Sequence, residues 1–205
     1  MDRLLAWPDR EVWLVLDGPP AVYYLVDQAA GGVLINAPPF SRATYEGLCR
    51  HAGPRYLFLP SRFGARDLGA WRAAGVRVLV SAEEEGVADA DLRVGGQHKL
   101  TRTIDFVPLP GRTRGTCGLR LKNLPGALFV GPALAVGDSG WPELIPRPDD
   151  YSYENRLIGT VGLGGQVFDY LFTQKSAKSP VVQGGMDSGI LAYNKGYESS
   201  PSLQV

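Results

Sequence analysis

The chain of 205 residues is poor in side chains that bind transition metals: it has two histidines, His51 and His98, and two cysteines, Cys49 and Cys117. The cysteines form no Cys-x-x-Cys pair and no Cys/His spacing, which excludes a zinc ribbon and a dithiol redox motif. We expect both thiols to be buried and unpaired, in a reducing intracellular compartment. His51 is expected at a helix end, and His98 in a solvated glycine-rich loop.

The chain also lacks an excess of charge of either sign and any long apolar run. Lysine plus arginine and aspartate plus glutamate number 21 each, so no overall field attracts nucleic acid or an anionic membrane. No apolar stretch approaches the ~20 residues that span a bilayer. We therefore expect neither a nucleic-acid partner nor membrane insertion. The first seven residues are too short and too lightly charged for a signal peptide, and the sequence leaves cytoplasm and organelle (such as a plastid stroma) both open.

Glycine and proline are abundant, at 26 and 16 residues, as is typical of many short elements joined by turns. Apolar runs predict strands at 11–17, 21–27 and 33–36, which the short turns join into an antiparallel meander. A β-α-β-α alternation follows, which indicates parallel strands with crossover helices. Its elements are a helix at 42–51 with Ser41 as N-cap, a strand at 56–59, a helix at 67–74 ended by Gly75, a strand at 76–80, and a short helix begun by a capping box of Ser81 and Glu84.

The second half predicts mainly strands again. A weak strand or turn lies at 92–96, and further strands lie at 104–109, 119–121 and 127–130. A helix is expected from about Tyr151 to Gly164, with Asp149 and Asp150 as its N-terminal residues, and a last strand at 167–172. An α/β (α+β) fold, an αββα sandwich within residues 1–172, accounts for this order.

Residues 173–205 differ in character. Serine, glycine and proline dominate, and no period of 2 or 3.6 is visible. We predict an extended C-terminal arm that cannot build a core of its own. Its scattered apolar residues could anchor it on another surface: Val181, Val182, Met186, Ile190, Leu191, Tyr193, Tyr197 and Leu203.

Three stretches, 57–67 (LFLPSRFGARD), 110–116 (PGRTRGT) and 128–134 (LFVGPAL), resemble the metallo-β-lactamase fold family. The resemblance runs from about Val12 to Phe172 and implies the αββα sandwich of that family. Members that hydrolyse their substrates bind one or two metal ions. The ligands come from a His-x-His-x-Asp-His motif, a Pro-Gly-His turn, an Asp in a third turn and a final His, and they activate a bound water.

The positions that match this pattern hold other residues. In one register Ser61, Phe63, Ala65 and Arg66 replace the first motif; in a second, longer register Arg62 and Asp67 match, while Ser61 and Leu68 replace histidines. Such side chains do not form a tetrahedral or octahedral metal site, so the resemblance implies no metal or other cofactor here. The seven vacated ligand positions are Ser61, Phe63, Ala65, Arg66, Arg112, Pro132 and Lys175.

Three of these positions, Arg66, Arg112 and Lys175, carry cations. If the fold brings them together, they need neutralisation by carboxylates or by an anionic group of a ligand or protein partner. The alternative is that their heads are solvated. Phe63 and Pro132 are expected to fill part of the cleft. Ser61 has no adjacent histidine base, so we expect no catalytic residue.

Two functional hypotheses follow. The first is a non-catalytic metallo-β-lactamase-like scaffold or binding protein, a subunit or accessory factor of a larger assembly, which binds a protein partner through residues 176–205. The alternative is a hydrolase of thioesters or similar small esters with a displaced metal site, which rests on fold analogy alone.

Overall fold

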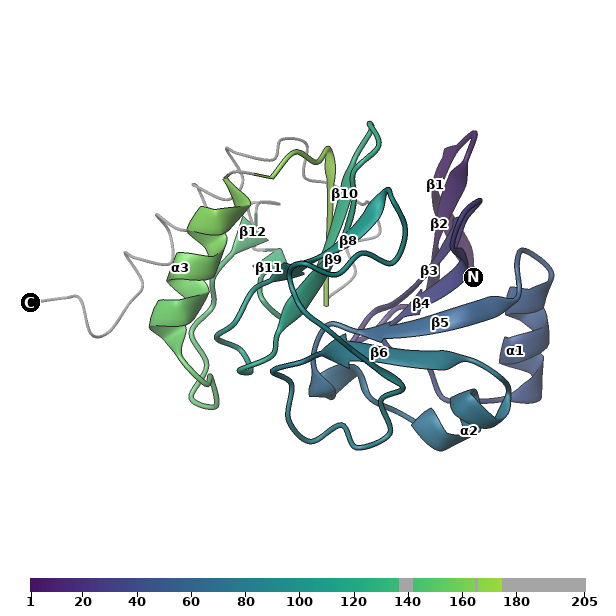
Figure 1. The fold of residues 1–205 in the computed structure, drawn as a ribbon, viewed down its shortest axis with the longest axis horizontal. Helices are drawn as coiled ribbons and strands as arrows, with labels where there is room; N and C mark the ends of the chain where they lie inside the picture. The colour runs from purple at the N-terminus through teal and green to yellow at the C-terminus, as the bar shows by residue number, and fades with distance from the viewer. Residues whose placement is uncertain (137–141, 165, 175–205) are drawn as a thin grey trace, which may run out of the picture.

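The computed structural model describes residues 1–136, 142–164 and 166–174 as two facing β-sheets with helices on the outer faces (Figure 1). This is the αββα sandwich that the sequence predicts. The extended arm falls outside the described residues, and so does Lys175. The division at residue 172 therefore stays a prediction, although Thr173 still belongs to the last strand of the sandwich.

The larger sheet has seven strands in sequence order, β1 to β7. The first four pair antiparallel, which confirms the predicted meander, and β4 to β7 pair parallel, which confirms the crossover region. The elements of this half are β1 (Asp2–Trp7), β2 (Arg10–Leu16), β3 (Val22–Asp27), β4 (Gly31–Ile35), α1 (Arg42–Cys49), β5 (Pro54–Leu59), the 3-10 turn η1 (Arg62–Gly64), α2 (Leu68–Ala73), β6 (Arg77–Ser81) and β7 (Leu92–Val94).

Two expectations for this half are wrong. The strand β1 lies at the sheet edge and was not predicted, because its exposed polar residues Asp2 and Arg3 weaken the apolar pattern. No helix follows β6: the Ser81 backbone oxygen accepts from the Glu84 backbone N–H in a turn, and Glu84 is drawn into a tertiary contact. The local capping-box pattern gave the wrong answer because a distant partner outweighs it.

The smaller sheet has the order β13-β10-β9-β8, with β10 and β13 parallel and the other pairs antiparallel. A two-stranded ribbon of β11 and β12 follows β10 and was not predicted. The elements are β8 (Ile104–Pro108), β9 (Cys117–Leu121), β10 (Ala127–Gly131), β11 (Ala135–Val136), β12 (Pro142–Glu143), α3 (Tyr153–Leu163) and β13 (Tyr170–Thr173).

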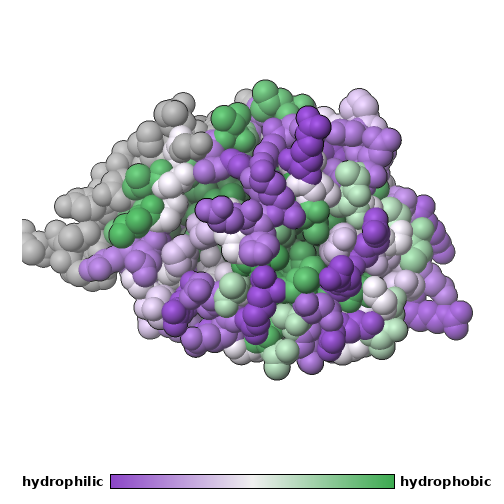
Figure 2. Space-filling model, in the orientation of Figure 1, coloured by the Kyte–Doolittle hydropathy of each residue, from purple (hydrophilic) through white to green (hydrophobic). Residues whose placement is uncertain are grey.

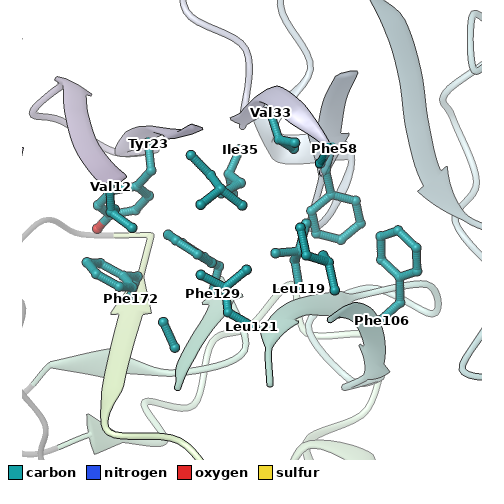
Figure 3. Close-up of a cluster of buried hydrophobic side chains, with 14 of the residues drawn as sticks. Val12, Tyr23, Val33, Ile35, Phe58, Phe106, Leu119, Leu121, Phe129 and Phe172 are labelled. Carbon is teal, nitrogen blue, oxygen red and sulfur yellow. The ribbon is translucent and has the colours of Figure 1, made fainter. Parts of the chain in front are cut away.

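The main core lies between the two sheets (Figure 3). Val12, Tyr23 and Ile35 point from the larger sheet toward Phe129 and Phe172 of the smaller one. The rings of Phe129 and Phe172 stack with centroids 4.6 Å apart. Burial of such side chains stabilises a fold by about 1.5–3 kcal/mol each. Every second residue along a strand faces this core, and β3, β4 and β10 are buried on both faces, so most strands stand out in the sequence as apolar runs.

Two further clusters attach the helices. On the outer face of the larger sheet, Leu48 of α1 and Trp71 of α2 pack with Leu57 and Val78. The indole of Trp71 donates to the Pro38 carbonyl at 3.1 Å, so its polar atom is satisfied in the interior. On the outer face of the smaller sheet, α3 packs through Leu157 and Leu163.

The cysteines are unpaired, and only one is buried. Cys117 of β9 is buried as expected, and burial raises the pKa of its thiol to about 12. Cys49 lies at the end of α1 and is exposed, so the expected burial of this thiol is wrong. Its helix does begin as predicted, because the Ser41 hydroxyl accepts from the Thr44 N–H at 3.0 Å.

Candidate functional site

Pro60 after β5, Cys117 at the start of β9, Gly131 at the end of β10 and Gln174 after β13 meet at one edge of the sandwich. The Pro60 carbonyl after β5 accepts from the Cys117 N–H at 2.9 Å, and the Gly131 carbonyl at the end of β10 accepts from the Gln174 N–H at 2.9 Å. Gly131 has φ +55, and a Cβ there would lie 2.4 Å from Pro60 Cβ. The close approach of these two loops therefore depends on a glycine.

A second glycine joins this edge to α3. Gly111 has φ +132, and a Cβ there would lie 2.2 Å from Arg156 Cγ and 2.6 Å from the Ser152 carbonyl. That carbonyl belongs to the N-cap of α3, whose N–H donates to the Gly111 carbonyl at 3.0 Å. The turn at 110–116 thus rests directly against the start of α3.

Arg112 lies in this turn and is only 5% exposed. Its guanidinium donates to Asp149 Oδ2 at 2.6 Å, to the Asp149 carbonyl at 2.9 Å and to Asp150 Oδ1 at 3.3 Å. The hydrogen bond from Arg112 is the main cause that lowers the pKa of the Asp149 carboxyl. Carboxylates of this chain therefore provide the neutralisation that Arg112 requires.

Asp150 is shared with a second buried arginine. Its Oδ2 accepts from Arg156 Nη1 at 2.6 Å, and Arg156 also donates to the carbonyls of Ile145 and Ala133 at 2.8 and 3.0 Å. Burial lowers the pKa of the Arg156 guanidinium, and Asp150 opposes that effect. We refer to Arg112, Asp149, Asp150 and Arg156 as the Arg112 network. It joins the turn at 110–116, the loop before α3 and α3 itself.

The sequence placed both aspartates wrongly. The helix α3 begins at Tyr153 with Ser152 as N-cap, so Asp149 and Asp150 precede it rather than form its N-terminus. Their partner Arg112 lies 37 or more positions away. A signal for Arg156 did exist: it lies on the same helical face as Thr160 and Leu163, which predicts burial.

An aromatic ring covers the Arg112 network. Arg112 Cζ lies 4.6 Å from the ring centroid of Phe63, a cation–π distance, and Arg62 Cζ lies 5.3 Å from the same ring. Phe63 is 36% exposed, so it separates the buried guanidinium from solvent only on one side. Two of the vacated ligand positions, Phe63 and Arg112, are thus brought together in direct contact.

Glu84 is a buried carboxylate beside the same turn, and the sequence did not predict it as a site residue. Its side chain is fully buried, and Oε2 accepts from the Thr113 hydroxyl at 2.5 Å. Arg62 Nη1 lies 3.7 Å from Oε1, which has no hydrogen-bond donor among the described residues. Glu84 therefore links the loop after β6 to the turn that carries Arg112.

The other predicted positions are placed as follows. Ser61 is buried, Ala65 and Arg66 are exposed, and Pro132 is half-buried. Arg66 forms no ion pair with any residue that the structure describes. The expected convergence of Arg66 and Arg112 stays a prediction. In the second register, Asp67 Oδ2 accepts from the Phe40 N–H at 2.9 Å, which gives this carboxylate a local structural partner.

The donor set does not fit the metal centre that the fold family implies. The side chains at the described ligand positions are a hydroxyl, a phenyl ring, a methyl group, two guanidiniums and a proline ring, and none is the imidazole or carboxylate that such a centre uses. Within residues 1–136, 142–164 and 166–174 no group of three or more His, Cys, Asp or Glu side chains is suitably arranged to hold a metal ion.

Comparison with solved structures supports the fold independently of these loops. The chain superposes on a metallo-β-lactamase from Staphylococcus aureus subsp. aureus COL with a TM-score of 0.69 and 13% identity, covering 96% of this chain and 65% of that one. An archaeal metallo-β-lactamase superfamily protein from Sulfolobus tokodaii gives 0.65 and 11%, with coverage of 98% and 90%. A Cronobacter sakazakii metallo-β-lactamase described by an HARLDQ motif gives 0.58 and 14%, with coverage of 95% and 94%.

The chain therefore has the metallo-β-lactamase fold. At these identities the likeness concerns the fold alone. No family model matches the sequence, and no curated protein sequence resembles it significantly. None of the helices in the described part of the chain is long and apolar enough to cross a membrane. On the face shown in Figure 2, hydrophilic residues alternate with smaller hydrophobic patches.

Proposed function

We propose that this protein is a non-catalytic metallo-β-lactamase-fold scaffold, which acts as a subunit or accessory factor of a larger assembly. One observation carries the proposal: Arg112, at a position where the resemblance implies a metal-binding histidine, is buried and bound by Asp149 and Asp150. A buried guanidinium repels a cation, and it accepts no proton in catalysis.

The Arg112 network also resists rearrangement. Removing one partner from a buried ion pair costs about 3–5 kcal/mol, because an uncompensated charge is left in the interior. Releasing Asp150 to bind a metal ion would carry a cost of this kind, because its side chain is only 4% exposed. The proposed role therefore treats this edge as part of the scaffold rather than as a reaction centre.

The proposed contact with a protein partner is the arm at 176–205. The support is compositional: scattered apolar residues stand in a segment rich in serine and glycine, which favours ordering on another surface over an independent core. Such a segment gains apolar burial only on binding, so its apolar side chains should dominate the affinity.

The experiment purifies three forms from the source cells under native conditions: the full chain, a form that ends at Gln174, and a full-length variant with Ile190→Ser, Leu191→Ser and Tyr193→Ser. Mass spectrometry measures partners, and elemental analysis of the same samples measures metal. We expect one reproducible stoichiometric partner set with the full chain, and its loss from both altered forms. Recovery of the same partners with all three forms would show that residues 176–205 are not the segment that binds them.

The alternative hydrolase is tested on the same samples. A small acyl thioester is offered with and without added Zn²⁺, Mn²⁺ or Fe²⁺. The scaffold role predicts no saturable hydrolysis above the rate with heat-denatured protein. Saturable hydrolysis together with about one metal ion per chain would replace the proposal with a displaced metal site.

A further inference from the structure

A cavity of about 370 Å³ lies next to the Arg112 network, at the edge formed by the loops after β10 and before α3. Pro19, Pro132, Leu134 and Ile145 supply an apolar wall, and Arg147 and Arg156 supply cationic groups. This volume falls in the range of sites for small organic ligands, which combine mostly apolar walls with a few polar groups. The arrangement has an apolar part and a cationic part.

Arg147 and Arg156 differ in how many partners their guanidinium N–H groups have. Arg147 is exposed, and its guanidinium forms no hydrogen bond or ion pair with a residue in the described ranges. In contrast, Arg112 and Arg156 both bind Asp150. Within the described ranges, Arg147 forms no direct ion pair in this corner, although its charge helps to lower the pKa of the Asp149 carboxyl.

Arg156 adds an unused donor. Of its five N–H groups, three are accounted for by Ile145, Ala133 and Asp150. Its Nε is buried and has no acceptor among the described residues. A buried donor without a partner is unfavourable, so an acceptor that reaches it would be stabilised.

We propose that this cavity binds a small organic carboxylate with a compact apolar body. Guanidinium groups match the two oxygens of a carboxylate in a planar fork, and the apolar wall receives the rest of the molecule. Arg147 would provide the charge contact at the rim, and the unpaired Nε–H of Arg156 would offer a donor at the base. The proposal needs no metal and no hydrolysis, so it stands apart from the scaffold role.

The test titrates the full chain with hexanoate and with hexanamide, at constant ionic strength, by calorimetry and ligand-observed NMR. The two probes share the apolar body and differ in charge. We expect saturable hexanoate binding, and affinity for hexanamide lower by tenfold or more. Equal affinities, or no saturable hexanoate binding at millimolar concentrations, would overturn the proposal.

Variants locate the binding. Arg147→Gln should weaken hexanoate binding about tenfold, because the charge-assisted contact is lost. Ile145→Glu should abolish it, because a like charge enters the apolar wall. Both residues are exposed, so the fold should persist. The matched control is Arg66→Gln, an exposed arginine outside the cavity lining, which should leave the affinity unchanged. An equal loss with Arg66→Gln would assign the anion to another site.

Discussion

Two clusters of arginine and aspartate bind loops and strands in this protein, and they differ in depth. In the Arg112 network, the side chains of Arg112, Asp150 and Arg156 are all at most 6% exposed. On the smaller sheet, Asp105 of β8 binds Arg120 and Lys122, whose side chains are 20% and 31% exposed. Similar chemistry is thus found in the interior in the first cluster and closer to solvent in the second.

The depth of each cluster determines how much its ion pairs contribute to the stability of the fold. Near solvent, water competes with each partner, so an ion pair contributes little. In the interior, each charge depends on its partner, and the loss of one leaves the other unsatisfied. The Arg112 network therefore determines how the turn at 110–116 sits on α3, whereas the Asp105 cluster adds to a strand pair that backbone hydrogen bonds already hold.

The largest expected effect comes from Asp150→Asn. This change removes the charge that Arg112 and Arg156 share, so we expect the free energy of unfolding to fall by about 3–5 kcal/mol. Urea denaturation measures it. Asp149→Asn is the matched control, because that side chain is 65% exposed and its change should destabilise the fold far less. Equal losses from both variants would mean that burial does not distinguish the two aspartates.

The next effect tests the backbone framework that holds the network. Gly131→Ala places a methyl group against Pro60 in a positive-φ conformation, so we expect a loss of about 2–4 kcal/mol. Gly69→Ala in α2 is the control, since a Cβ there meets nothing within 4 Å and should be neutral or stabilising. Thermal unfolding of both variants compares them. An unchanged melting temperature in both variants would show that the contact between Gly131 and Pro60 is not required for stability.

A smaller effect is expected for Glu84→Ala. The change removes the acceptor of the buried Thr113 hydroxyl, which should cost about 1–3 kcal/mol. The control is Glu83→Ala, whose side chain is 61% exposed in its pair with Arg114 and should cost about 0–1 kcal/mol. Chemical denaturation measures the free energy of unfolding of both variants. A greater loss from Glu83→Ala would contradict the structural role given to Glu84.

The smallest effect concerns acid stability at the Asp105 cluster. Burial raises the pKa of Asp105, but hydrogen bonds from Arg120 and Lys122 outweigh it and lower the pKa overall. A lowered folded-state pKa stabilises the fold above the unfolded value of about 3.9, and this contribution is lost as the pH falls through the folded value.

The corresponding measurement compares wild type with Asp105→Asn between neutral pH and acid. We expect wild type to be slightly more stable at neutral pH and the difference to shrink as the pH falls below about 4. A difference that stays constant over this range would show that Asp105 acts through packing rather than through charge.

The sequence predicted the framework better than the site. The strand β10 and residues 56–59 of β5 are apolar runs, and the N-cap Ser41 is a local signal, so these elements could be predicted without tertiary information. The resemblance of the stretches 57–67 and 128–134 also indicated the fold family, and the structure brings their residues Pro60 and Gly131 together. These features depend on residues that are close in sequence or on a simple apolar period.

The site depended on contacts that local patterns do not contain. Glu84 matched a capping box with Ser81, yet its partner Thr113 lies 29 positions away. Asp149 and Asp150 resembled the N-terminal residues of a helix, whereas the structure has Ser152 as the N-cap. The Arg112 hypothesis required neutralising carboxylates but did not name them, because pairing between distant charged residues leaves no periodic signal.

Metal binding by the purified full chain tests the central claim most directly. Native mass spectrometry, after incubation with Zn²⁺, Mn²⁺ or Fe²⁺ and removal of excess ion, counts bound ions per chain. If Arg112 and its carboxylates have replaced a metal centre, the chain should retain no stoichiometric ion, and a chelator should leave the melting temperature unchanged. About one ion per chain, with a lower melting temperature after chelation, would contradict that claim.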